Sequence, residues 1–167
     1  EDVNEYTLST GFDVSSASFV DSFDVSGQDT NPRGLRFNND GTKMFLVGND
    51  GDDINEYTLT TGFDVSSASF VDSFDVSGQD TGPVSIAFNN DGTKMFVSGN
   101  AGDDINEYTL TTGFDVSSAS FVDSFDVSGQ DTNPKGITFN NDGTKMFVVG
   151  NTGDDINEYT LTTGFDV

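Results

Sequence analysis

The chain repeats itself with a period of 51 residues. The same sequence context surrounds Asn4, Asn55, Asn106 and Asn157, and 55 − 4 = 51. Three periods account for 153 residues, and the remaining 14, residues 154–167, nearly copy residues 1–14. A period of this size is typical of arrays in which one supersecondary unit cannot bury its apolar face without a neighbour. The repeat therefore predicts a fold built of stacked, near-identical units.

Each repeat contains four short runs rich in aromatic and β-branched residues, separated by Asn, Asp and Gly. In the middle copy these runs are 85–88, 94–97, 105–110 and 121–127. Alternation in such runs predicts β-strands, and Asn-Asn-Asp-Gly at 89–92 predicts a tight turn. No window carries apolar residues at helical spacing for more than a turn, so we expect an all-β fold with almost no helix.

One run of the repeat resembles a known family. The pattern Pro-x-Gly-Ile-x-Phe-x-x-Asp-Gly-Thr-Lys-Met-Phe-Val, present as Pro134 to Val148, is similar to the blade repeat of bacterial and phage β-propellers of the YVTN/NHL-like kind. The resemblance implies a β-propeller of near-identical, four-stranded blades of about 51 residues, three blades per chain. The chain is then a single repeat domain, 1–167, made of a partial blade 1–30, blades 31–81 and 82–132, and a partial blade 133–167.

The phase of the repeat predicts self-assembly. The chain begins with a third and a fourth strand and ends with a first, second and third strand, so the N-terminal fourth strand of one copy could complete a C-terminal blade. Three blades are too few to close a ring, because four is the practical minimum. We therefore expect a homo-oligomer, most simply a dimer of six blades, or a chain that belongs to a longer array.

Charge narrows the range of partners. The chain has 29 acidic and six basic residues and a net charge of −23. Such a surface repels phosphate backbones and anionic lipids, so we expect no nucleic-acid partner and no binding to anionic membranes. No apolar run is long enough to insert into a membrane. The acidity suits an extracellular location or the surface of a cell or virion.

The few positions that differ between copies predict a binding site. They fall at the start of the unit and on its first strand, which lines the central channel of a propeller. Three of the six cations are among them. The predicted ligand-binding residues of this channel or its rim are Arg33, Arg36, Val84, Ala87, Lys135 and Thr138. The site would take a glycan or a protein ligand. Random drift between recently duplicated copies is the alternative interpretation.

A second candidate site is the acidic turn that follows the second strand of each unit. Carboxylates crowded by Gly are the hard oxygen ligands that Ca²⁺ prefers. The candidate ligands are Asp50, Asp52, Asp53, Asp103, Asp104, Asp154 and Asp155. The spacing is not that of an EF-hand, and a turn of Asn, Asp and Gly is also typical of any hairpin. Ca²⁺ is the one cofactor that the sequence suggests.

The sequence argues against catalysis. It contains no His and no Cys, so the usual nucleophile and base pairs are missing, and near-identical blades offer repeated rather than unique sites. We therefore expect no catalytic residues and no enzyme, but a non-catalytic structural or interaction module, surface-exposed and multivalent, that completes its ring by self-assembly. The alternatives are a subunit of an extracellular fibre that assembles head to tail and, third, a carboxylate-based glycosidase or lactonase-like hydrolase.

Overall fold

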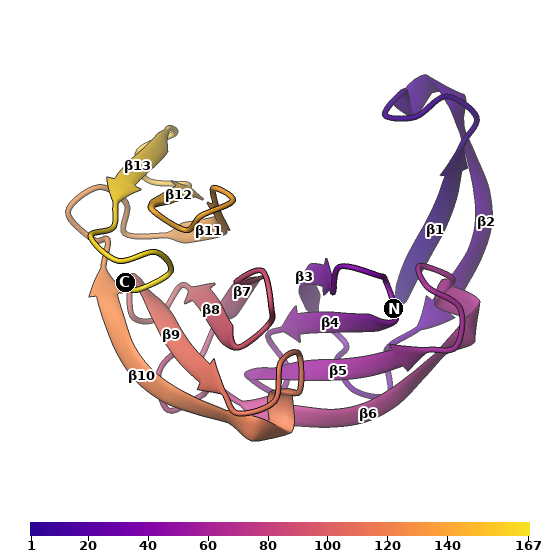
Figure 1. The fold of residues 1–167 in the computed structure, drawn as a ribbon, viewed down its shortest axis with the longest axis horizontal. Helices are drawn as coiled ribbons and strands as arrows, with labels where there is room; N and C mark the ends of the chain where they lie inside the picture. Colours follow the sequence, from indigo (N-terminus) through magenta and orange to yellow (C-terminus); the bar gives the residue numbers. More distant parts are fainter.

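The computed structural model describes all of residues 1–167 and has the all-β fold that the sequence predicts (Figure 1). Its strands are β1 (Asp2–Leu8), β2 (Ala17–Asp24), β3 (Pro32–Phe37), β4 (Lys43–Gly48), β5 (Asp53–Leu59), β6 (Ala68–Asp75), β7 (Pro83–Phe88), β8 (Lys94–Gly99), β9 (Asp104–Leu110), β10 (Ala119–Asp126), β11 (Pro134–Phe139), β12 (Lys145–Gly150) and β13 (Ile156–Thr160). Three short 3-10 helices precede the outer strands: η1 (Val14–Ser16), η2 (Val65–Ser67) and η3 (Val116–Ser118). No helix is long and apolar enough to cross a membrane.

The strands form four antiparallel sheets that follow one another along the chain. Two sheets have four strands, β3–β4–β5–β6 and β7–β8–β9–β10. The chain starts with the two-stranded sheet β1–β2 and ends with the three-stranded sheet β11–β12–β13. Figure 1 shows these sheets around an open arc, with β3 and β7 toward the inside and β6 and β10 along the outer rim. The structure therefore contains repeated four-stranded sheets but no closed ring.

Local sequence explains the turns that join the strands. In the second unit, Gly92 has φ of +73°, a conformation that a side chain would strain. The side chain of Asn89 accepts the backbone N–H of Lys94 at 3.0 Å, and that of Asp91 accepts the N–H of Thr93 at 3.1 Å. These bonds fix the register of β7 against β8. The other units repeat the same turn.

Apolar residues from neighbouring sheets meet between them, so each sheet needs another on its face. One cluster combines Phe45 and Ile54 of the second sheet with Ile86, Met95 and Val97 of the third. All five are at most 4% exposed. Since burying a large apolar side chain stabilises by roughly 1.5–3 kcal/mol, these interfaces provide much of the stability.

An ion pair also joins neighbouring sheets. The ammonium of Lys43 lies 2.7 Å from Oε1 of Glu56 and donates to the carbonyl oxygen of Phe114 at 2.6 Å. The other oxygen of Glu56 accepts the N–H of Val116, at the start of η3, at 2.9 Å. Glu56 is 2% exposed, so the pair is buried where the next sheet packs. Lys94 and Glu107 form the same contacts one unit later.

Candidate functional site

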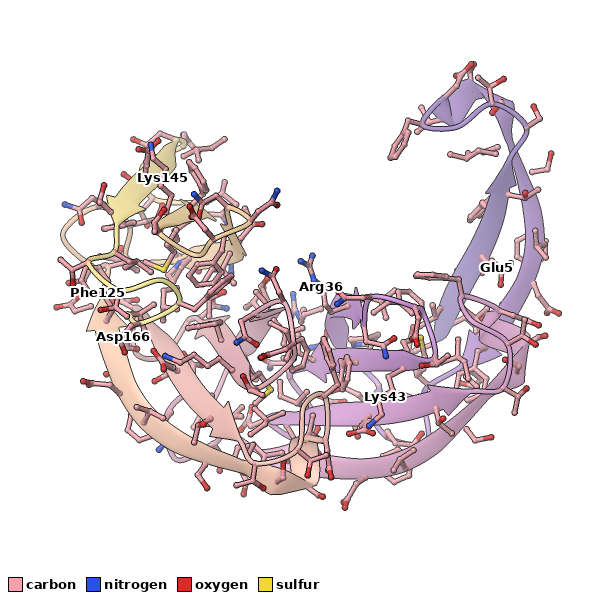
Figure 2. All side chains as sticks on the ribbon, in the orientation of Figure 1. Glu5, Arg36, Lys43, Phe125, Lys145 and Asp166 are labelled. Atoms are coloured by element: carbon pink, nitrogen blue, oxygen red, sulfur yellow. The ribbon has the colours of Figure 1, made fainter.

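The first strands of successive sheets lie side by side, and a hollow opens where β3 and β7 end. Its volume is about 400 Å³. The lining residues come from the two strands, the turns that follow them and the loops after β5 and β9: Leu35, Arg36, Phe37, Asn38, Asn39, Phe63, Phe88, Asn89, Asn90 and Phe114. Figure 2 shows Arg36 projecting from β3 toward the inside of the arc. One cation, four amides and four phenylalanines thus surround one space.

Arg36 is the only charged residue of this hollow, and its guanidinium forms no ion pair. It is exposed, whereas the phenylalanines around it are held by one another. The ring centroids of Phe37 and Phe63 lie 5.4 Å apart, and those of Phe88 and Phe114 lie 5.3 Å apart. An unpaired guanidinium on an aromatic wall is suited to a planar anion or to negative charge that develops during a reaction.

A ladder of amides holds the rim of the hollow. Nδ2 of Asn39 donates to the carbonyl oxygen of Asn90 at 2.8 Å, and Nδ2 of Asn90 donates to that of Asn141 at 2.7 Å. The ladder ties the first turns of three successive sheets together. It also leaves the side-chain oxygens of Asn39 and Asn90 available as hydrogen-bond acceptors beside Arg36.

The structure distributes the six residues of the predicted channel site over several places. Arg36 lines the hollow described above, Arg33 lines a second hollow of about 370 Å³ beside β1, and Thr138 lines a third of about 250 Å³ on the terminal sheet. Ala87 is buried between sheets, and Val84 is half-buried. The ammonium of Lys135 donates to Oδ1 of Asn100 in the preceding sheet at 2.8 Å. Binding of a glycan or a protein by these residues stays a prediction.

The acidic turns lie at the opposite ends of the strands, where β4, β8 and β12 end. Each turn wraps around a buried aspartate from the preceding loop. Asp80, 1% exposed, accepts the backbone N–H of Gly82 at 2.6 Å, of Ala101 at 3.2 Å and of Gly102 at 3.3 Å. Asp29 and Asp131 play the same part in the other units. Burial alone would raise the pKa of Asp131, but hydrogen bonds from Gly153, Asn133 and Thr152 bring it below its ordinary value.

Two carboxylates in or beside these turns have a buried oxygen with unsatisfied hydrogen-bonding capacity. Oδ1 of Asp52 and Oδ1 of Asp104 are buried without a hydrogen-bond partner. Burial, and then the charges of Asp80, Asp75 and Asp29, raises the pKa of Asp52. Burial followed by neighbouring aspartates also raises the pKa of Asp104. The turns therefore concentrate negative charge that the fold does not neutralise.

Three of the predicted Ca²⁺ ligands accept hydrogen bonds from neighbouring side chains. Asp50 accepts from the hydroxyl of Thr30, Asp53 accepts from Nδ2 of Asn55 at 2.7 Å, and Asp155 accepts from Nδ2 of Asn157 at 3.0 Å. The remaining candidates, Asp52, Asp103, Asp104 and Asp154, lie in the same loops or at the start of β9. The structure brings no three acidic side chains together in an arrangement that could hold a metal ion. Ca²⁺ binding stays a prediction.

Several buried acidic residues with structural roles were not predicted from the sequence. Glu56 and Glu107 are buried acids in strands, and Asp29 and Asp80 are buried acids in loops. The available signal was their identity in every copy, inside otherwise apolar or turn segments. The amide ladder through Asn90 was hidden in the same way, because its residues look like ordinary turn formers.

Comparison with known proteins places the fold. No family model and no curated protein sequence matches the chain. Among solved structures, a Bacteroides fragilis protein assigned as a 6-phosphogluconolactonase shares 16% identity at a TM-score of 0.66, over 98% of this chain and 46% of its own. The Pseudomonas aeruginosa periplasmic gluconolactonase PpgL shares 18% at 0.56, over 77% and 35%. The β-propeller domain of Myceliophteria thermophila Cps50 (Swd1) shares 15% at 0.53, over 77% and 37%.

These similarities show a propeller-like fold and nothing finer. They agree with the predicted all-β repeat architecture, whereas no family model supports the blade motif as the mark of a particular family. The chain spans less than half of the length of each of the three proteins. The number of sheets in a complete ring is therefore not given by the comparison.

The comparison corrects the predicted function. We expected a non-catalytic structural or interaction module, or a fibre subunit, and no enzyme. That expectation is wrong on this comparison, because several of the structurally similar proteins are named as lactonases or as a luciferin-regenerating enzyme. The emphasis on a structural role loses its support with it, whereas a location outside the cell or at the surface of a cell or virion stays a prediction. The physical reason for the error is that the absence of His and Cys excludes only some catalytic mechanisms, and charge stabilisation by Arg is not among them.

Proposed function

We propose that this chain builds part of a propeller hydrolase that opens the lactone ring of a sugar acid. The observation that carries the proposal is the unpaired Arg36 in the 400 Å³ hollow, a lone cation among amides and aromatic rings in a chain of net charge −23. The similarity to proteins named as gluconolactonase and 6-phosphogluconolactonase supports the reaction class. A sugar-sized substrate fits a hollow of this volume.

The chemistry follows from the lining residues. Water adds to the carbonyl carbon of the lactone, and the carbonyl oxygen becomes an oxyanion, which the guanidinium of Arg36 stabilises. The side-chain oxygens of Asn39 and Asn90 accept hydrogen bonds from substrate hydroxyls, and the rings of Phe37 and Phe88 pack on the C–H face of the substrate. The carbon–oxygen bond of the ring then breaks, the leaving oxygen takes a proton, and the product is a hydroxy acid.

No carboxylate or histidine lines the hollow, so the proton lost by the attacking water passes to solvent. Since hydroxide is then the better nucleophile, the catalysed rate is expected to rise with pH through neutrality without a bell-shaped optimum. A bell-shaped profile would indicate a general base outside this hollow.

The experiment measures proton release from gluconolactone and from 6-phosphogluconolactone, with spontaneous hydrolysis subtracted. The expected result is turnover by the wild-type chain and a loss of about 100- to 1,000-fold in kcat/KM for Arg36→Gln, the usual effect of removing one oxyanion donor. Arg36→Lys keeps the charge but not the planar fork and should retain more activity than Arg36→Gln.

Two outcomes would contradict the proposal. One is a wild-type rate no higher than spontaneous hydrolysis with both lactones. The other is wild-type activity in Arg36→Gln, which would move the reaction away from the hollow. A loss confined to the phosphorylated lactone would instead mean that Arg36 binds the phosphate rather than the oxyanion. Circular dichroism of each variant checks that the fold is unchanged.

A further inference from the structure

The two ends of the arc expose residues that are buried in every internal unit. Tyr6 in β1 is 58% exposed, whereas its equivalent Tyr57 in β5 is fully buried. At the other end, Val149 in β12 is 44% exposed, whereas its equivalent Val47 in β4 is fully buried. The surrounding sequence is the same in each copy, so the difference in burial comes from a missing neighbour and not from the residues themselves.

The two terminal sheets are also complementary in their strands. The first sheet has only the third and fourth strands of a unit, β1 and β2, and the inner edge of β1 is unpaired. The last sheet has only the first three, and the outer edge of β13 is unpaired. Unpaired edges of this kind are templates for another chain. Figure 1 shows the two terminal sheets at opposite ends of the arc, where they do not contact each other.

Two series of bonds between sheets stop at the last sheet. Lys43 and Lys94 each donate to a phenylalanine carbonyl 71 residues later, but Lys145 has no such carbonyl. The amide ladder runs from Asn39 to Asn90 to Asn141, and the amide of Asn141 finds no further acceptor. In Figure 2, Lys145 lies on the exposed terminal sheet.

A further bond between sheets occurs only once inside the chain, because the middle copy has Val84 at the position of the donor. Lys135 donates to Oδ1 of Asn100 in the preceding sheet, 35 residues earlier. Arg33 occupies the position of Lys135 two repeats earlier, and the preceding sheet, β1–β2, has no second strand with a following loop that would supply an amide. The equivalent of Asn100 on a second copy would be Asn151, on the loop after β12.

We propose that a second copy of this chain fills both ends, so that two chains close a ring of six four-stranded sheets. In each junction, β2 of one copy becomes the outer strand of the sheet begun by β11 and β12 of the other. Both interrupted series then continue at the register seen inside the chain: Lys145 meets the carbonyl of Phe63, and Asn141 meets that of Asn39. Arg33 meets Asn151 in the same way as Lys135 meets Asn100.

The strand count supports a closed pair. Each chain has 2 + 4 + 4 + 3 = 13 strands, so two chains have 26, and six four-stranded sheets use 24. The two surplus strands are duplicates, because β1 and β13 are both third strands and compete for one place in each junction. With five residues, β13 is shorter than β1, with seven, so β1 of the partner is the better candidate for that place.

A second copy is a better occupant of the exposed ends than an unrelated partner, because it brings the same residues that already pack on each face inside the chain.

The test is the mass of the full chain in solution, by light scattering coupled to size exclusion and without any substrate, so that it is independent of the proposed activity. The expected mass is 2 × 17.8 = 35.6 kDa. Val149→Asp places a charge on a residue that is 44% exposed on β12 here, but whose equivalent Val47 is fully buried. This variant should be a folded monomer of 17.8 kDa.

A matched control uses a valine that stays exposed. Val20 on β2 is 49% exposed, and its equivalents Val71 and Val122 are 50% and 48% exposed inside the chain. Val20→Asp should therefore remain a dimer. A wild-type monomer, a series of open polymers, or a Val149→Asp variant that still dimerises would overturn the proposal.

A second measurement tests the register. The chain has no cysteine, so Arg33→Cys combined with Asn151→Cys creates the only two thiols. A short thiol-reactive cross-linker should then join two chains into a covalent dimer. The pair Asn100→Cys and Lys135→Cys, which already contact each other within one chain, should give cross-linked monomers. Absence of cross-linked dimers where the internal pair reacts would contradict the proposed junction.

Discussion

The buried ion pair between sheets allows a sharp comparison, because the same pair occurs both buried and exposed in one chain. Lys43 and Glu56 lie 2.7 Å apart, with side chains 29% and 3% exposed. Lys145 and Glu158 lie 2.5 Å apart, with side chains 46% and 49% exposed. Sequence context and spacing are the same, so a difference between equivalent substitutions must come from the environment.

Glu56→Gln should lower the free energy of unfolding by about 2–3 kcal/mol. Removing one partner of a buried pair costs roughly 3–5 kcal/mol, and the partial exposure of Lys43, together with the acceptor that Gln retains for the N–H of Val116, reduces this figure. Glu158→Gln should cost about 0–1 kcal/mol, as usual for exposed pairs. The two variants therefore differ by about 1–3 kcal/mol, which at about 2–4 °C per kcal/mol for a chain of this size corresponds to a difference in Tm of about 2–12 °C.

The assay is urea unfolding followed by far-UV circular dichroism, with all variants made in the monomeric Val149→Asp background, because association would cover the Lys145–Glu158 pair and shift apparent stability. Glu107→Gln should behave like Glu56→Gln, since Glu107 is 1% exposed and pairs with Lys94 at 2.7 Å. If Glu56→Gln and Glu158→Gln fall within 0.5 kcal/mol of each other, burial between the sheets does not control the pair, and the reasoning fails.

Two further predictions concern the turns. Asp52→Asn should raise Tm at pH 7 by the equivalent of about 1 kcal/mol and should change it little at pH 4. Folding raises the pKa of Asp52, whose Oδ1 is buried without a hydrogen-bond partner. The carboxylate therefore destabilises the fold as pH rises above the pKa of the unfolded chain, which is near 4. Asp103→Asn is the control for the backbone, since both residues have positive φ. Gly92→Ala should cost about 2–4 kcal/mol, because its φ is +73° and a Cβ would overlap the ring of Phe114. Gly78→Ala, with open space around it, should change stability by less than 0.5 kcal/mol.

Most of the fold could be predicted because the pattern of each strand and turn occurs in several near-identical copies along the sequence. The run 94–97 predicts the strand observed as β8, and the turn at 89–92 is where the structure has it. Differences in burial between equivalent residues of the copies could not be predicted in the same way. Tyr6 and Tyr57 share one sequence context but not one environment, because burial between sheets depends on a neighbour that only three-dimensional arrangement supplies.

The predicted channel site grouped two arginines that the structure separates. Arg33 and Arg36 were grouped because they lie on one strand. Arg33 lies at an irregularity of the strand pairing, between Pro32 and Gly34, whereas Arg36 pairs regularly with Phe45. The structure accordingly places them in separate hollows. The aromatic walls of the Arg36 hollow come partly from Phe63 and Phe114, on loops that only the packing of two sheets brings there.

The two proposals meet in the six cations of the chain. Lys43, Lys94 and Lys145 pair with glutamates, and Lys135 bonds across sheets to Asn100. If a second copy places Asn151 beside Arg33, five of the six cations join sheets to one another. Arg36 is then the one cation that pairs with no other group, although the chain has 29 acidic residues that could pair with it. That isolation has a cost in stability but is what a site for transient negative charge requires, so confirming the dimer would strengthen the assignment of Arg36 to the reaction.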